Sequence, residues 1–196
     1  MAEVELPNPE ELEERRDKSF SRRVALVTAV YAVVLAIASL GGNNAMKEML
    51  ISEQEAANQW AYYQSKVIRE HLNRGNKLML EAQLAEPSGL KGAEREKFEA
   101  LAKKFADEEK RMVVDKKEIE PKARSFEAER DRNQTKDPYF DYAEVLLQIS
   151  IVCASVSILS TSRPMFWFSS VLAALGALST INGFLLVFKL PFLHGH

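Results

Sequence analysis

The sequence predicts an all-α membrane protein in which three transmembrane helices carry a long antiparallel, coiled-coil-like helical hairpin between the first and the second. Two observations lead to this fold class. Charge is strongly partitioned, because residues 44–142 hold 19 of the 26 Lys and Arg and 20 of the 28 Asp and Glu. Outside that segment lie three charge-free windows, each near the ~20 residues that cross a bilayer. A soluble domain mixes the two classes along its length.

The predicted membrane helices cover 24–42, 143–160 and 165–190, with a C-terminal tail over 191–196. The first contains the uncharged run VALVTAVYAVVLAIASL and follows a long polar segment, so we interpret it as a signal anchor and not as a cleaved signal peptide. The second carries Glu144 at its start and Gln148 one turn further, so it is expected to need neighbouring helices. Residues 160–164 allow only a tight turn before the third.

Basic residues near the first span set the expected orientation. The N-terminal segment 1–23, with a short helix that begins at Pro9 after an Asn8 cap, is predicted to be cytoplasmic. The hairpin and the C-terminus would then be periplasmic. Basic residues before the second span argue the other way, but charges in a loop longer than ~60 residues steer topology weakly. The basic residues before the first span are Arg15, Arg16, Lys18, Arg22 and Arg23, and those before the second are Arg124, Arg130, Arg132 and Lys136.

The hairpin is predicted over 43–142, with its turn near 85–92 at Pro87-Ser88-Gly89. On the first arm, small or apolar residues recur about every 3.67 residues, which favours nearly straight packing. On the second arm the spacing is close to 3.5. The first stripe comprises Met49, Ala56, Trp60, Tyr63, Val67, His71, Gly75, Leu78 and Ala82, and the second Phe98, Leu101, Phe105, Met112, Ile119, Ala123 and Phe126.

Proline and glycine are expected to interrupt the arms. Gly75 weakens the first arm by up to ~1 kcal/mol relative to Ala. Pro121 should kink or restart the second, because proline cannot donate to the i−4 carbonyl. Asp137-Pro138 is expected to end that arm and lead into aromatic residues suited to a membrane interface, namely Tyr139, Phe140 and Tyr142.

No motif for catalysis is present: the sequence lacks a glycine-rich phosphate loop, CxxC, HExxH and a recognisable Ser, His and Asp set. We therefore predict no enzyme activity and no catalytic, cofactor-binding or metal-ligating residues. His71 is interpreted as a packed residue on the apolar stripe. A net charge of −2 argues against nucleic acid as a partner.

Helix association within the membrane is the strongest functional signal. Small residues four apart let helix backbones approach closely. Gln148 and Asn182 are polar groups inside the spans, interpreted as interhelical hydrogen-bond donors and, alternatively, as the lining of a pathway. The predicted packing residues are Ala25, Ala29, Ala32, Ala36, Gln148, Gly176, Thr180, Asn182 and Gly183, with Ala173–Ala177 and Ser179–Gly183 as further small pairs.

Three passages resemble a bacterial membrane family catalogued as domain of unknown function 4337. They are LPNPEELEE, SRRVALVTAVYAVVLAIASLGGNNAMKE and QEAANQWAYYQSKVIREHL, and the entry to the second span, Asp137-Pro138-Tyr139-Phe140-Asp141, also fits. The resemblance covers nearly the whole chain. It implies a multi-pass protein of the bacterial inner membrane and carries over no activity, cofactor or functional residue.

The leading hypothesis is a non-enzymatic, self-associating inner-membrane scaffold or accessory subunit that uses its hairpin for protein contacts. Its partners would be the lipid bilayer, further copies of the chain, or another membrane or periplasmic protein. The alternative is an oligomeric channel or transport component. The expected contact residues are Trp60, Tyr62, Tyr63, Phe98 and Phe105.

Overall fold

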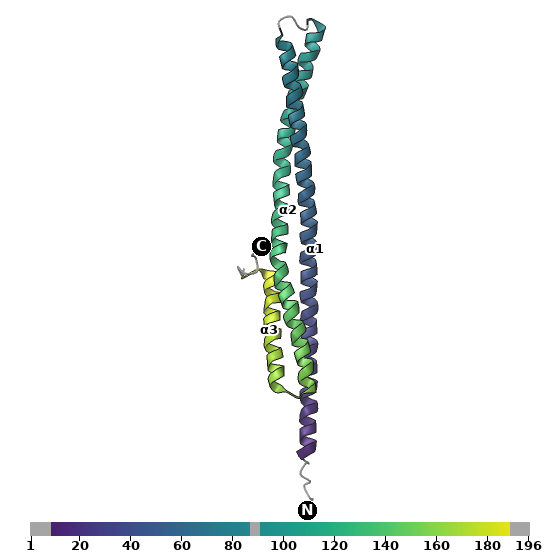
Figure 1. Ribbon diagram of the computed structural model, residues 1–196, viewed down its shortest axis with the longest axis vertical. Helices are drawn as coiled ribbons and strands as arrows, with labels where there is room; N and C mark the ends of the chain where they lie inside the picture. The colour runs from purple at the N-terminus through teal and green to yellow at the C-terminus, as the bar shows by residue number, and fades with distance from the viewer. Residues whose placement is uncertain (1–8, 87–90, 189–196) are drawn as a thin grey trace, which may run out of the picture. The chain divides into compact units, whose positions relative to one another are not determined.

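The structure, a computed structural model, describes residues 9–86 and 91–188. These residues form three α-helices and no strand: α1 spans Pro9–Ala85, α2 spans Ala93–Leu159 and α3 spans Arg163–Leu185 (Figure 1). The prediction of an all-α protein is confirmed. The Asn8 cap, the Pro87-Ser88-Gly89 turn, the last two residues of the third predicted span and the tail 191–196 lie outside the described residues.

Each helix contains a stretch that is long and apolar enough to cross a membrane. The stretch in α1 continues into charged sequence, since the helix passes Gly41 and Gly42 without a break. The third predicted span, 165–190, is helical only to Leu185. Leu186 takes a left-handed conformation with φ of 50°, and its N–H bonds the carbonyl of Asn182 at 2.7 Å, which closes the last turn.

The expected interruptions in α2 do not end the helix. Pro121 and Pro138 both lie inside Ala93–Leu159. A proline in a helix interior costs about 3 kcal/mol, so neighbouring packing must offset it. Ile119 and Ala123 are buried on either side of Pro121, and Tyr139 and Phe140 are buried directly after Pro138. The buried faces of these turns hold the helix together where its sequence favours a break.

The chain forms two compact units. One contains Met1–Glu48 and Arg132–His196, and the other Met49–Asp131. The described part of the first is called here the apolar bundle, and that of the second the charged helix pair. The core of the apolar bundle takes residues from all three helices, namely Val24, Tyr31, Ala38, Ala143, Leu147, Ala154 and Ala173.

Candidate functional site

In the charged helix pair, the residue number on α1 rises as that of its partner on α2 falls, so the two segments are antiparallel. Three ion pairs establish this order: Glu53–Arg130 at 2.9 Å, Lys66–Asp115 at 2.7 Å and Arg74–Glu109 at 2.7 Å. The helices are thereby joined along much of their length.

Buried and half-buried side chains of this pair repeat every seven residues on both helices, and these positions form the seam between them. A seven-residue repeat keeps one face of a helix on its neighbour. On α1 the seam comprises Ser52, Gln59, Lys66, Asn73 and Leu80 with Ala56, Tyr63, Glu70, Lys77 and Leu84; on α2 it comprises Phe98, Phe105, Met112, Ile119 and Phe126 with Ala102, Glu109, Lys116, Ala123 and Arg130.

The predicted 3.67-residue spacing of the first arm is wrong. His71, Gly75 and Leu78 are exposed, whereas Lys66 and Glu70 are buried. The prediction admitted only small and apolar residues to the stripe, so it drifted off the seam where the seam becomes charged. The spacing predicted for the second arm agrees with the structure, except that Leu101 is mostly outside the seam.

Charged side chains fill the middle of the seam. Lys66 is only 7% exposed and donates to the Asp115 carboxylate at 2.7 Å. One turn further, Glu70 is 6% exposed and forms ion pairs with Lys116 of α2 and, at 3.1 Å, with Arg74 of its own helix. A buried charge is tolerated only when paired, and both of these are.

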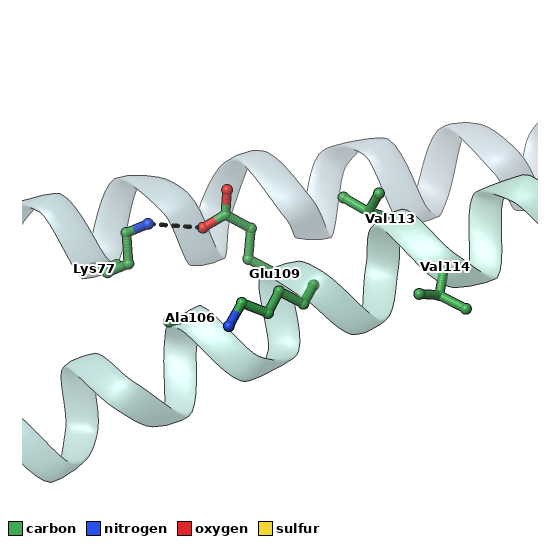
Figure 2. Close-up of a pocket in the computed structure, with 6 residues that line it drawn as sticks. Lys77, Ala106, Glu109, Val113 and Val114 are labelled. Carbon is green, nitrogen blue, oxygen red and sulfur yellow. Dashed lines mark hydrogen bonds and ion pairs between the residues drawn. The ribbon is translucent and has the colours of Figure 1, made fainter.

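The network continues through Glu109, whose carboxylate accepts from Arg74 at 2.7 Å and from Lys77 at 3.0 Å. Figure 2 shows the Lys77–Glu109 pair bridging α1 and α2 at the edge of a hollow of about 410 Å³. Its other lining residues are Ala106, Lys110, Val113 and Val114. The Glu109 carboxylate is already committed to two cations, so the hollow offers a ligand mainly valine surface.

These contacts shift the pKa values of the groups involved. The hydrogen bond from Lys66 holds the pKa of Asp115 below its usual value, and Asp115 raises the pKa of Lys66 in turn. Hydrogen bonds from Arg74 and then Lys77 lower the pKa of Glu109. Near neutral pH Lys66, Asp115 and Glu109 are therefore charged.

The aromatic residues expected to form a docking cluster are largely engaged within the chain. Trp60 is half-buried, packs edge-to-face on Tyr63 with centroids 5.5 Å apart, and donates its indole N–H to Glu127 at 2.8 Å. Tyr62 stays 50% exposed. A cation lies over each ring: Lys66 over Tyr62 at 5.0 Å, Lys116 over Tyr63 at 5.8 Å and Arg124 over Trp60 at 5.9 Å.

Phe98 and Phe105, the other two expected contact residues, are half-buried seam positions of α2. Of the five residues, only Tyr62 is exposed, and the other four are half-buried. The sequence did not predict which of these aromatic faces α2 covers.

In the apolar bundle, glycines of two helices pack against one phenyl ring. Phe140 is 1% exposed. A Cβ added at Gly41 would lie 2.5 Å from its ring, and one added at Gly183 would lie 2.9 Å from it. Phe184 closes the site edge-to-face at 4.9 Å between centroids. Sequence reasoning used Gly41-Gly42 only to mark the end of a span, although a glycine pair facing an aromatic is a signal of close packing.

The predicted packing residues divide by helix. Gly176, Thr180 and Gly183 are buried, and a Cβ at Gly176 would lie 2.8 Å from Leu147 of α2. The alanine row of α1 is exposed within the chain: Ala25, Ala29, Ala32 and Ala36. Within one chain this row packs against neither α2 nor α3, because α1 presents Val24, Tyr31 and Ala38 instead.

Polar contacts across the bundle come from serine and tyrosine, which sequence reasoning did not single out. Ser169 donates to the Ser150 carbonyl at 2.7 Å, and Tyr31 donates to Ser170 at 2.8 Å. Gln148 is exposed on the bundle surface. Both side-chain ends of Asn182 bond the backbone of Phe188, at 2.8 and 2.9 Å, so Asn182 serves to close the end of α3.

Most of the amino-acid sequence matches the model of one protein family. The model of DUF4337, described as a domain of unknown function, matches residues 20–186. The chain belongs to this family. The match takes in both the apolar bundle and the charged helix pair of this DUF4337 chain, and confirms the resemblance noted in the sequence. Comparisons with curated proteins and with solved structures gave no match.

The described residues, 9–86 and 91–188, hold no group of three or more His, Cys, Asp or Glu side chains that could bind a metal ion. What they do hold is a seam filled by its own ion pairs, and helix faces that this seam leaves uncovered.

Proposed function

We propose that this DUF4337 chain is a non-enzymatic membrane scaffold or accessory subunit that associates with other chains, its own copies included, through the charged helix pair acting as a coiled-coil hairpin. One observation carries the proposal. α1 exposes large apolar side chains in this otherwise charged unit although its seam with α2 is already filled. Exposed apolar surface of this kind marks interaction sites. The side chains are Leu50, Ile51, Ile68, Leu72, Leu78 and Met79.

The proposal places the protein in a bacterial inner membrane as a multi-pass chain, with its N-terminus cytoplasmic and its helix pair and C-terminus periplasmic. Two observations support it. Each helix has a stretch fit to cross a membrane, and large apolar side chains of the bundle face outward, as lipid contact requires. The basic residues before the first stretch supply the orientation.

Orientation is tested with a cysteine at Lys117, an exposed residue of α2, in a Cys153→Ala background. Labelling by a membrane-impermeant thiol reagent in intact cells is the expected result. Labelling only after the cells are opened would reverse the assignment. Cys153→Ala alone is the control, because it has no cysteine for the reagent to label.

Association is tested by the native mass of the full chain extracted gently from its own membrane. A discrete multiple of 22.1 kDa supports self-assembly, and a stoichiometric foreign chain supports an accessory subunit. A single chain with nothing bound, both after extraction and after cross-linking in the intact membrane, contradicts both versions.

A further inference from the structure

α1 carries a second seven-residue repeat, on the side away from the seam. Its ten positions are uncharged; nine are exposed and Ser65 is half-buried. This set is called the outer stripe, and its members are Ile51, Gln54, Asn58, Ala61, Ser65, Ile68, Leu72, Gly75, Met79 and Ala82.

The outer stripe faces away from α2. At 100° per residue its centre lies roughly 150° around the helix from the centre of the seam. From Ile51 to Ala82 it extends about 47 Å at 1.5 Å per residue. That is about four and a half heptads, and the three to four heptads needed for a stable helix pair are therefore available.

The outward face of α2 differs at the same heptad positions. Those ten residues are also exposed, but five are charged, which suits a surface that stays in water. They are Lys97, Ala100, Lys104, Asp107, Arg111, Val114, Glu118, Pro121, Ser125 and Ala128, of which Lys97, Lys104, Asp107, Arg111 and Glu118 carry charge. The absence of charge is therefore a property of one face of α1 and not of the charged helix pair in general.

We propose that the outer stripe binds the outer stripe of a second copy of this chain, with the two α1 helices parallel, in register and related by a two-fold axis. The proposal rests on the proposed function, because two copies inserted with the same orientation have parallel α1 helices. In such an isologous contact each residue meets its own counterpart. A charge-free stripe suits this arrangement, since any charge on it would be brought against itself.

The residues that flank the outer stripe also favour a second copy. In a parallel pair, each position on one edge lies beside the position five residues later on the other chain. No like-charged pair results, because each pair contains at most one charged residue. The five pairs are Leu50–Glu55, Ala57–Tyr62, Gln64–Arg69, His71–Asn76 and Leu78–Gln83.

Part of the outer stripe suits a parallel helix pair. Asn58 would meet Asn58 of the other copy, an arrangement that fixes two strands and one register. Ile68, Leu72 and Met79 supply apolar contact, and each is at least 60% exposed in the single chain. Gly75 has nothing within 4 Å of an added Cβ, so this position leaves room for a neighbouring helix.

Cross-linking of single cysteines in intact membranes tests the proposal. In the Cys153→Ala background, Leu72→Cys and Ile68→Cys are expected to form a disulfide-linked dimer under mild oxidation. Val114→Cys, at an equally exposed position on the outward face of α2, is the matched control and should remain monomeric. Cross-linking at Val114 but not at Leu72 would overturn the proposal.

A charge introduced into the stripe provides the second measurement. Leu72→Glu should shift the native mass toward the monomer by about tenfold or more in the association constant, because it buries two unpaired carboxylates. Val114→Glu should leave the mass unchanged.

The outcomes separate the two proposals. An oligomer that persists in Leu72→Glu, without cross-linking at Leu72, overturns the stripe contact and leaves the scaffold role standing. A foreign chain cross-linked at Leu72 also overturns it and supports an accessory subunit. A wild-type chain that stays single in the membrane overturns both.

Discussion

The apolar bundle and the charged helix pair bury residues at the same interval of seven but with opposite chemistry. In the bundle the repeat on α1 is Val24, Tyr31 and Ala38, and on α3 it is Ser169, Gly176 and Gly183. In the charged helix pair, the same seven-residue repeat along α1 comprises Ser52, Gln59, Lys66 and Asn73. One helix geometry thus accepts a seam of small and apolar groups in one unit and, in the other, a seam whose middle holds ion pairs.

If the bundle lies in a membrane, as proposed above, the difference follows from what surrounds each unit. A helix surrounded by lipid gains little from hiding apolar side chains, so association depends on close backbone approach and a few hydrogen bonds. The glycines around Phe140 provide that approach in the bundle. In water, a narrow helix pair cannot exclude solvent fully, and paired charges at Lys66 and Glu70 remain tolerable there. The two seams should therefore respond to different perturbations.

The largest effect is expected from Phe140→Ala. Its ring fills the space between Gly41 and Gly183, which have no side chains that could refill it. Truncation should lower the free energy of unfolding by about 3–5 kcal/mol. Equilibrium unfolding in mixed micelles measures the change. Phe168→Ala, an exposed site on the same bundle, is the control and should have little effect.

The next effect compares one substitution at two places on α1. Gly41→Ala places a Cβ against Phe140 and should cost about 1–3 kcal/mol by overpacking. Gly75→Ala meets nothing within 4 Å and should stabilise the helix by about 0.5–1 kcal/mol, because alanine loses less backbone freedom than glycine. The same unfolding measurement reports both changes in free energy. If both substitutions changed the stability in the same direction, the comparison between the two units would be wrong.

Acid should loosen the charged helix pair selectively. The pKa values of Asp115 and Glu109 are lowered from 3.8 and 4.5, so their stabilising effect is complete above these values and is lost as the pH falls below them. The raised pKa of Lys66 sets the other limit, with stabilisation lost only as the pH rises above 10.5. Protease cleavage within 49–131 should increase below about pH 4 while the bundle stays resistant.

Removing the titrating groups checks this interpretation. Asp115→Asn with Glu109→Gln should raise cleavage at pH 7 and flatten its dependence on acid. If the double variant kept the acid response of the wild type, carboxylates outside the seam would be responsible.

The smallest effect is expected from Ser169→Ala, which removes the 2.7 Å hydrogen bond to the Ser150 carbonyl across two helices of the bundle. Such bonds contribute about 0.6 kcal/mol on average. Ser155→Ala is the matched control, because the Ser155 hydroxyl is exposed and bonds only its own helix, at Ile151. Equal losses of stability in the two variants would show that the Ser169 hydrogen bond does not stabilise the bundle.

The sequence predicted an all-α chain with three long apolar stretches, but not that α1 and α2 each continue unbroken from the apolar stretch into the charged sequence. It predicted the α3 face as well: Gly176, Thr180 and Gly183 are buried as small-residue spacing suggested. On α1, Ala25 and Ala29 fit the same rule but are exposed within the single chain, so their role in packing stays a prediction. A row of small residues shows that a helix can be approached, but not which neighbour approaches it.

The seam of the charged helix pair was harder to predict for a physical reason. Charged residues are assigned to water by default, so Lys66 and Glu70 were left off the stripe. Their burial depends on Asp115 and Lys116, about 50 residues away in the sequence. A search for oppositely charged residues at the seam positions of the two arms would have found Glu70 and Lys116, but not Lys66 and Asp115, because Asp115 lies beside the seam positions.

The order of charges along the seam also limits how the two arms can slide. A shift of α2 by one heptad in one direction would set Lys66 against Lys122 and Arg74 against Lys116. A shift in the other direction would set Glu70 against Glu109. Apolar residues alone would tolerate either displacement, since a heptad step returns the same face. The ion pairs thus favour one register between two long helices whose seam repeats every seven residues.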